Sequence, residues 1–236
     1  MSPTRSCILL PWAAVVLCYG CGSKHEPSDL GEPGPSDLGT ATGCARDELV
    51  GTSCGSSSAV IINPEDDRLP LEDECDIFLG SISFSDTLNS DLSMLMGVRE
   101  VRGDLTMFRT DLLASLRGLD DLEEVDGNLM LRETARLESL DSLRQLRQVG
   151  GVLNLSSLRG LLNLDGLSEL ECVGSLRLDL PERITTLAAL DRLQVVHGSI
   201  HIKAPGVAMD ELLEFSDRFE TTARITLNGE TIQEGS

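Results

Sequence analysis

The chain has 236 residues, 41% of them hydrophobic, which is enough for one sizeable core. It carries 39 Asp and Glu residues against 19 Lys and Arg residues, a formal net charge of −20 at pH 7. Such an acidic surface repels phosphate groups. The composition therefore argues against nucleic-acid binding and against adsorption to anionic lipid headgroups.

The first twenty residues have the organisation of a signal peptide. A single positive charge, Arg5, precedes the apolar run CILLPWAAVVLCY, which is too short to span a membrane. Small residues then flank Cys21 in the segment GCGSKHE, an arrangement that resembles the cleavage and lipidation site of bacterial lipoproteins. We expect residues 1–20 to be removed and Cys21 to carry a lipid anchor. Ordinary secretory cleavage is the alternative.

Residues 21–43 form a polar segment rich in Gly and Pro that contains PSDLG twice. Nothing in it can bury an apolar face, so it is predicted to be a disordered tether ahead of one folded domain at 44–236. The protein is thus expected to be exported and anchored by lipid at the outer membrane or cell surface. A periplasmic or secreted soluble form is the alternative. Loss of Trp12 and Tyr19 with the signal peptide would leave no Trp or Tyr, the side chains that sugar sites and tight interfaces favour.

Four cysteines remain once Cys7, Cys18 and Cys21 are set aside. An exported protein meets oxidising conditions, and four cysteines allow three disulfide connectivities. CxxC spacing is lacking, so a zinc site is disfavoured, while free buried thiols are the alternative to disulfides. These cysteines are Cys44, Cys54, Cys75 and Cys172.

A motif of the form V-x-G-x-L-x-L recurs along the chain. Full copies are VRGDLTM (101–107), VDGNLML (125–131), VGGVLNL (149–155) and VHGSIHI (196–202), with shorter copies LGSISF (79–84) and VGSLRL (173–178). The intervals between successive motif glycines are 23, 24, 24, 23 and 24 residues, which indicates a repeating architecture rather than a ligand-binding loop. These glycines are Gly80, Gly103, Gly127, Gly151, Gly174 and Gly198.

Each repeat has two hydrophobic patterns. In the repeat that starts at Gly127, Leu129 and Leu131 alternate with polar neighbours, which predicts a half-buried strand. Apolar residues then follow at intervals of three up to Val149, which favours short extended or 3₁₀-like pieces that turn around a core. The glycine before each strand is expected to allow a corner that a side chain would obstruct.

The two ends depart from the repeat. AVIINP from Ala59 predicts the first strand, and the polar stretch 65–74 is predicted to be helical. Residues 207–220 place Met209, Leu212, Leu213 and Phe219 at helical spacing, which predicts an amphipathic capping helix before a last strand, ARITLNG.

The motif, the run L-x-x-L-x-x-L-x-x-V and the opening CGSSSAVIIN…LEDECDIFLGSISF resemble the receptor L domain over residues 54–227. That family comprises the leucine-rich β-helices of insulin- and growth-factor-receptor ectodomains and also occurs in bacterial surface proteins. The resemblance implies a mainly β, single-domain right-handed β-helix, a leucine-rich solenoid of about six to seven coils with a C-terminal capping helix. It also implies a disulfide between Cys54 and Cys75. Ordinary leucine-rich repeats are the second candidate fold.

The sequence offers little for catalysis. His197 and His201 could begin a metal site, but such sites need three or four convergent ligands, so we expect surface histidines. The acidic segment DDLEEVDG (120–127) lacks EF-hand spacing and is expected to be a solvated face. We expect a non-enzymatic protein without cofactor or metal. A β-helix polysaccharide lyase is the alternative, disfavoured because coils this uniform leave no room for catalytic loops.

Alternation along the strands predicts an outward sheet face as the binding surface. It carries Arg132, Arg177 and Lys203 against Asp179 in an acidic chain, and in the resembling family this face binds ligands. We expect an anionic partner, either a protein segment or a polysaccharide, with chance scatter of surface charges as the alternative. The candidate binding residues are Thr106, Phe108, Met130, Arg132, Asn154, Arg177, His201 and Lys203.

Overall fold

The computed structural model describes residues 51–55, 60–62, 75–87, 89–219 and 224–233, all within one compact unit of residues 41–236. The expected signal peptide, Cys21, the tether and the helix expected at 65–74 lie outside these residues.

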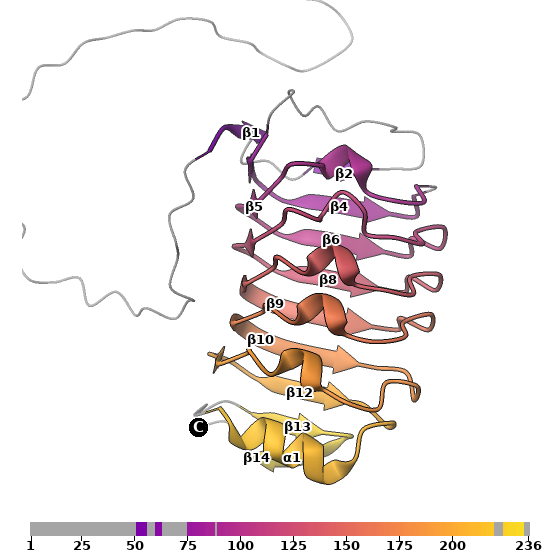
Figure 1. Ribbon diagram of the computed structural model, residues 1–236, viewed down its shortest axis with the longest axis vertical. Coiled ribbons are helices and arrows are strands. Elements are labelled where there is room, and N and C mark those ends of the chain that lie inside the picture. Colours follow the sequence, from indigo (N-terminus) through magenta and orange to yellow (C-terminus); the bar gives the residue numbers. More distant parts are fainter. Residues whose placement is uncertain (1–50, 56–59, 63–74, 88, 220–223, 234–236) are drawn as a thin grey trace, which may run out of the picture. The chain divides into compact units, whose positions relative to one another are not determined.

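The described part of the chain is mainly β with one α-helix, and its 14 strands form a mostly parallel sheet that does not close into a barrel (Figure 1). Two stacks of short strands run side by side along the repeat. One stack contains β1 (Ser53–Gly55), β3 (Ile77–Leu79), β5 (Glu100–Val101) and β7 (Glu124–Val125). The other contains β2 (Val60–Ile62), β4 (Ile82–Ser85), β6 (Leu105–Phe108) and β8 (Leu129–Arg132).

Both stacks join the long strand β9, because β7 and β8 pair with its two halves. The sheet continues from β9 through β10 and β12 to β13, and it ends in the antiparallel strand β14. These later strands are β9 (Gln148–Ser156), β10 (Cys172–Asp179), β11 (Val195–Val196), β12 (Ile200–Lys203), β13 (Ile225–Leu227) and β14 (Glu230–Gln233).

The strands pair in the register of the sequence repeat. Leu105 pairs with Leu129, which in turn pairs with Leu153, so equivalent leucines of successive repeats lie side by side. All three are fully buried. Burial of each leucine contributes about 1.5–3 kcal/mol, and it depends on the neighbouring repeat to cover the side chain.

The motif glycines allow the close stacking of the corner between the two stacks. A Cβ on Gly127 would lie 2.7 Å from the carbonyl carbon of Gly103, and one on Gly151 would lie 2.8 Å from that of Gly127. Real Cβ atoms do not approach backbone so closely, so a side chain here would push neighbouring repeats apart. The expected role of these glycines is confirmed.

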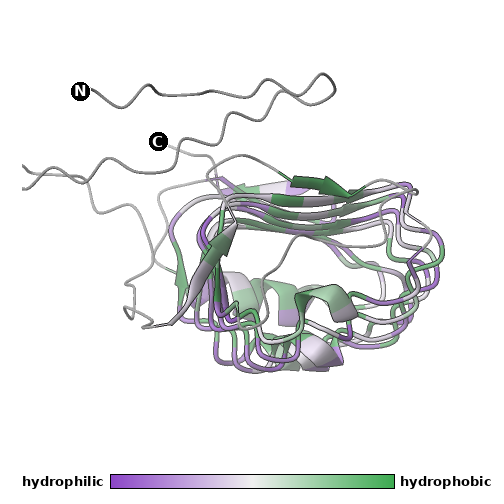
Figure 2. Cartoon of the chain, turned by 90° about the horizontal axis from the view of Figure 1, so that it is seen from above, coloured by the Kyte–Doolittle hydropathy of each residue, from purple (hydrophilic) through white to green (hydrophobic). Residues whose placement is uncertain are grey.

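The leucine runs close each repeat on the side away from the strands. Four of them contain a 3₁₀ turn, as predicted, and every turn buries its third residue against the core. Figure 2 shows the coiled turns on the side of the repeat opposite to the broad layer of strands. The turns are η1 (Ser93–Leu95), η2 (Asp141–Leu143), η3 (Asp165–Leu167) and η4 (Ala188–Leu190).

The predicted C-terminal helix is present as α1 (Met209–Asp217), which lies beside β13. Leu212 and Phe215 are buried, whereas Met209 is 38% exposed, so its expected inward position is wrong. Met209 is the first residue of α1, and the residues of the helix that pack against the core come later, from Leu212 onward.

Two polar side chains attach α1 to the preceding repeat. Glu211 accepts hydrogen bonds from the Thr186 hydroxyl and the Leu187 backbone N–H, at 2.8 and 2.7 Å. Arg218 donates to the carbonyls of Leu190, Asp191 and Leu193. The helix thereby satisfies backbone groups at both ends of the turn η4.

The disulfide between Cys54 and Cys75, which the family resemblance implied, is present with 5.6 Å between the Cα atoms. It ties β1 to the residues just before β3. Cys172 is also disulfide-bonded, and Cys44 lies outside the described residues.

Candidate binding face

The outward side chains of the sheet stand in two rows, because successive strands pair in register. The alignment predicted from the repeat is confirmed, whereas binding by these rows stays a prediction. The first row contains Ser83, Thr106, Met130, Asn154, Arg177 and His201, and the second contains Ser85, Phe108, Arg132, Ser156, Asp179 and Lys203. We call these twelve residues the outer face.

A hollow of about 290 Å³ opens on the outer face. Its origin is a difference in side-chain length between neighbouring strands. The short Asn154 and Ser156 of β9 lie between the long Arg132 of β8 and Arg177 of β10. We call it the arginine hollow, and its lining is Arg132, Asn154, Ser156, Ser157, Arg177, Asp179 and His201.

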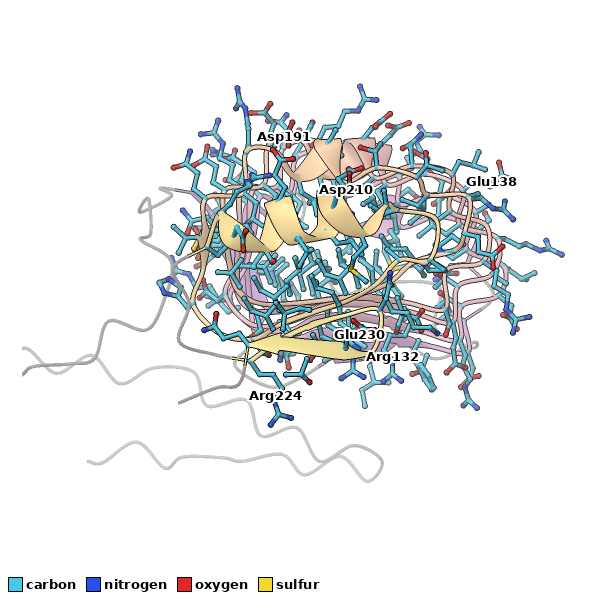
Figure 3. All side chains as sticks on the ribbon, turned by 90° about the horizontal axis from the view of Figure 1, so that it is seen from below. Arg132, Glu138, Asp191, Asp210, Arg224 and Glu230 are labelled. Atoms are coloured by element: carbon cyan, nitrogen blue, oxygen red, sulfur yellow. A yellow bond between two sulfur atoms is a disulfide. The ribbon has the colours of Figure 1, made fainter. Side chains whose placement is uncertain are left out.

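Arg132 points outward from β8 and lies beside an aromatic ring. Its guanidinium carbon lies 5.7 Å from the centroid of Phe108, and Arg109 lies 4.9 Å from the same centroid. Arg109 also donates to Asp86 at 2.8 Å, whereas Arg132 has no carboxylate partner among the described residues. Figure 3 shows Arg132 on the side of the sheet opposite to α1. A cation over a ring is oriented without being neutralised.

The charges around the hollow do not cancel. Asp179 pairs with Lys203, with 3.3 Å between Oδ1 and Nζ. Arg177, like Arg132, forms no ion pair within the described part of the chain. The lining therefore carries two guanidinium groups against one carboxylate that already has a cationic partner. This local excess of positive charge stands in a chain of formal charge −20.

The structure separates the predicted binding residues into two groups. Arg132, Asn154, Arg177 and His201 line the arginine hollow, but Thr106, Phe108, Met130 and Lys203 lie elsewhere on the outer face. Ser157 also lines the hollow and was not predicted; it directly follows β9 and has a left-handed backbone (φ 59°). The residue after the strand has φ between 52° and 59° in four successive repeats: Asp86, Arg109, Glu133 and Ser157. These four residues share no residue type, so no sequence signal marked this position.

The two candidate metal-binding histidines have different surroundings. His201 is half-buried in the hollow, whereas His197 is exposed, and its backbone N–H donates to the Val173 carbonyl. Among the residues that the structure describes, no three His, Cys, Asp or Glu side chains gather as metal ligands would.

The prediction that the acidic segment 120–127 is a solvated face is wrong in part, because one of its carboxylates is buried. Glu124 lies in β7 and is 7% exposed, beside the equally buried Glu100 of β5. Arg102 donates to Glu100 at 2.7 Å, and this bond raises the pKa of Arg102. Glu100 can be buried in this stack of short strands because the guanidinium of Arg102 pairs with its carboxylate.

No helix in the described ranges is both long enough and apolar enough to cross a bilayer. Comparisons with protein-family models, with curated proteins and with solved structures find no match to this chain.

Proposed function

We propose that this chain is an exported, non-enzymatic binding protein with a receptor L-domain-like fold, a right-handed solenoid of leucine-rich coils. The support for the fold is the agreement of three features. The strand register equals the sequence repeat, the corner glycines stack on one another, and the disulfide Cys54–Cys75 stands where the resemblance implied it.

The solenoid binds an anionic partner through its outer face. The observation that carries this proposal is the pair Arg132 and Arg177, two cations at one hollow of an acidic protein that have no carboxylate partner among the described residues. Guanidinium groups bind carboxylates in a fork geometry, so this pair suits carboxylates of a polysaccharide or a protein.

Charge reversal tests the proposal. The full-length protein is immobilised and exposed to two polyanions, polygalacturonate and poly-L-glutamate, at increasing salt. Arg132→Glu combined with Arg177→Glu should lower the affinity for either polyanion at least tenfold, because two attractive contacts become repulsive. The wild-type affinity should fall with ionic strength.

The matched control reverses two arginines that lie outside the outer face, Arg144 and Arg147. Arg144 follows the turn η2 and pairs with Asp141 at 2.6 Å, and both arginines are exposed. The control changes the net charge by the same amount but leaves the outer face unchanged, so it should leave most of the affinity intact. An equal loss in both double variants would show that binding responds to net charge and not to the outer face.

The proposal places the protein at a membrane through Cys21. Cys21→Ser should move the protein from the membrane fraction to the soluble fraction, because acyl chains are the anchor that the proposal invokes. Fractionation of cells that express the full chain measures this. A Cys21→Ser protein that stays in the membrane fraction after its N-terminus has been cleaved would contradict lipid anchoring.

A further inference from the structure

We infer that the arginine hollow is a subsite for one carboxylated sugar unit, so that the anionic partner is a polysaccharide that contains uronic acid. This inference rests on the proposed function and names its ligand class. Four features of the hollow carry it: its size, the positions of its cations, its hydrogen-bonding groups and its internal carboxylate.

The size fits a compact group. Pockets for small molecules range from roughly 300 to 1,000 Å³, and the 290 Å³ of the hollow lies at the lower limit. One pyranose ring fits such a space, whereas a folded protein surface could not enter it. An acidic peptide would pass over the hollow and touch its rim.

The two arginines stand at opposite corners. Arg132 belongs to the second row and Arg177 to the first, two strands away. Two strand spacings and two residues along the strand separate their Cα atoms by roughly 12 Å. The two guanidinium groups can therefore contact one small ligand from two sides, or the carboxylates of two successive sugar units.

The floor supplies groups that bind hydroxyls. Asn154 offers an amide, and Ser156 and Ser157 offer hydroxyl groups. Each can donate to and accept from a sugar hydroxyl. A site for phosphate or sulfate alone would use donors only, because such anions are acceptors.

The internal carboxylate argues against a site for densely charged anions. Asp179 lines the hollow although Lys203 pairs with it, and it would repel a run of Asp or Glu side chains or a row of sulfate groups. The same carboxylate accepts hydrogen bonds from sugar hydroxyls. A uronic acid presents one carboxylate and several hydroxyls, and the lining matches that combination.

The lack of Trp and Tyr in the described part of the chain is consistent with this ligand. Neutral sugars depend on stacking against aromatic rings, whereas a uronate gains its binding energy from guanidinium contacts. Phe108 is the aromatic residue of the outer face, and two arginines already lie against its ring.

The test compares three soluble probes by calorimetric titration of the full-length protein: a 1,4-linked trigalacturonate, the neutral trigalactose of the same linkage, and hexaglutamate. Trigalacturonate should bind at least tenfold more tightly than either of the others. Arg177→Gln should reduce its affinity at least tenfold, while Arg144→Gln should leave it unchanged.

A second variant tests the hollow itself. Ser156→Leu fills the floor without changing charge or the buried face of β9, and it should abolish trigalacturonate binding. Tighter binding of hexaglutamate, with a loss in Arg177→Gln, would overturn the inference and leave the proposed function standing. Trigalacturonate binding that Arg177→Gln and Ser156→Leu do not change would place the sugar site elsewhere. If no probe binds, and if reversal of Arg132 and Arg177 does not change the affinity for polyanions, both proposals are wrong.

Discussion

Polar side chains that follow the corner glycines bond one repeat to the next. The Ser81 hydroxyl accepts the Asp104 N–H at 2.9 Å, and the Asp104 carboxylate accepts the Asn128 N–H at 2.7 Å. The Asn128 amide oxygen then accepts the Val152 N–H at 2.8 Å. Backbone donors left over at the corner are thus satisfied between repeats. This column was not predicted, because its members share hydrogen-bonding capacity but not residue type.

The leucine positions were predicted residue by residue. Leu143 is fully buried in η2, and the next residue, Arg144, is exposed. Because the two residues are adjacent in the sequence, they form a matched pair that tests whether the leucines point into the core.

Leu143→Asp should cost several kcal/mol, because it places a charge without a partner where two repeats stack. Arg144→Asp should change the free energy of unfolding by at most about 1 kcal/mol, since it affects only an exposed pair with Asp141. Thermal or urea denaturation of the two variants measures the difference. Equal unfolding midpoints would show that the inward assignment is wrong.

The 3₁₀ turns begin in the same way in successive repeats. A side-chain oxygen accepts the backbone N–H of the residue two positions later. Ser139 accepts from Asp141 at 3.0 Å, Asn163 from Asp165 at 3.1 Å and Thr186 from Ala188 at 3.1 Å. Ser, Thr, Asn and Asp stabilise tight turns in this manner. The three-residue spacing of leucines predicted the turns, and this polar column could have fixed where they start.

The space available to a side chain at the second residue of the 3₁₀ turn differs between repeats. Gly166 lies against the backbone of Leu140, and an added Cβ would overlap the Leu140 carbonyl oxygen. The equivalent residue one repeat earlier is Ser142, which already has a Cβ.

Gly166→Ala should therefore destabilise the protein by about 1–3 kcal/mol, because the turns η2 and η3 must move apart. Ser142→Ala should change stability little, since it adds no atom to the contact. Denaturation curves compare the two substitutions. A stable Gly166→Ala protein would mean that the two turns do not pack this closely.

At the scale of the molecule, the sequence predicts most of the architecture, because one 24-residue period determines strand, corner and turn together. The elements without a repeat are harder to predict. The edge strand β14 is exposed along most of its length, so it lacks a hydrophobic pattern. Burial of Glu124 was missed because a charged residue in an acidic segment favours solvent.

The candidate site was predicted in part for the same reason. The period fixes which residues share a row, so Arg132 and Arg177 could be assigned to one face from the sequence. The hollow between them depends on the short side chains of Asn154 and Ser156 in the strand between, and on the turn at Ser157. Those features arise from neighbours 24 residues apart and need the three-dimensional structure.

The central claim is that an anionic partner covers the outer face at Arg132 and Arg177. Arginine-specific chemical labelling with and without saturating polygalacturonate, read by mass spectrometry of the full-length protein, tests it directly. Bound polyanion should protect Arg132 and Arg177 from the reagent and leave Arg144 and Arg147 as reactive as before. Unchanged labelling of Arg132 and Arg177, or protection of Arg144 and Arg147 instead, would contradict the claim.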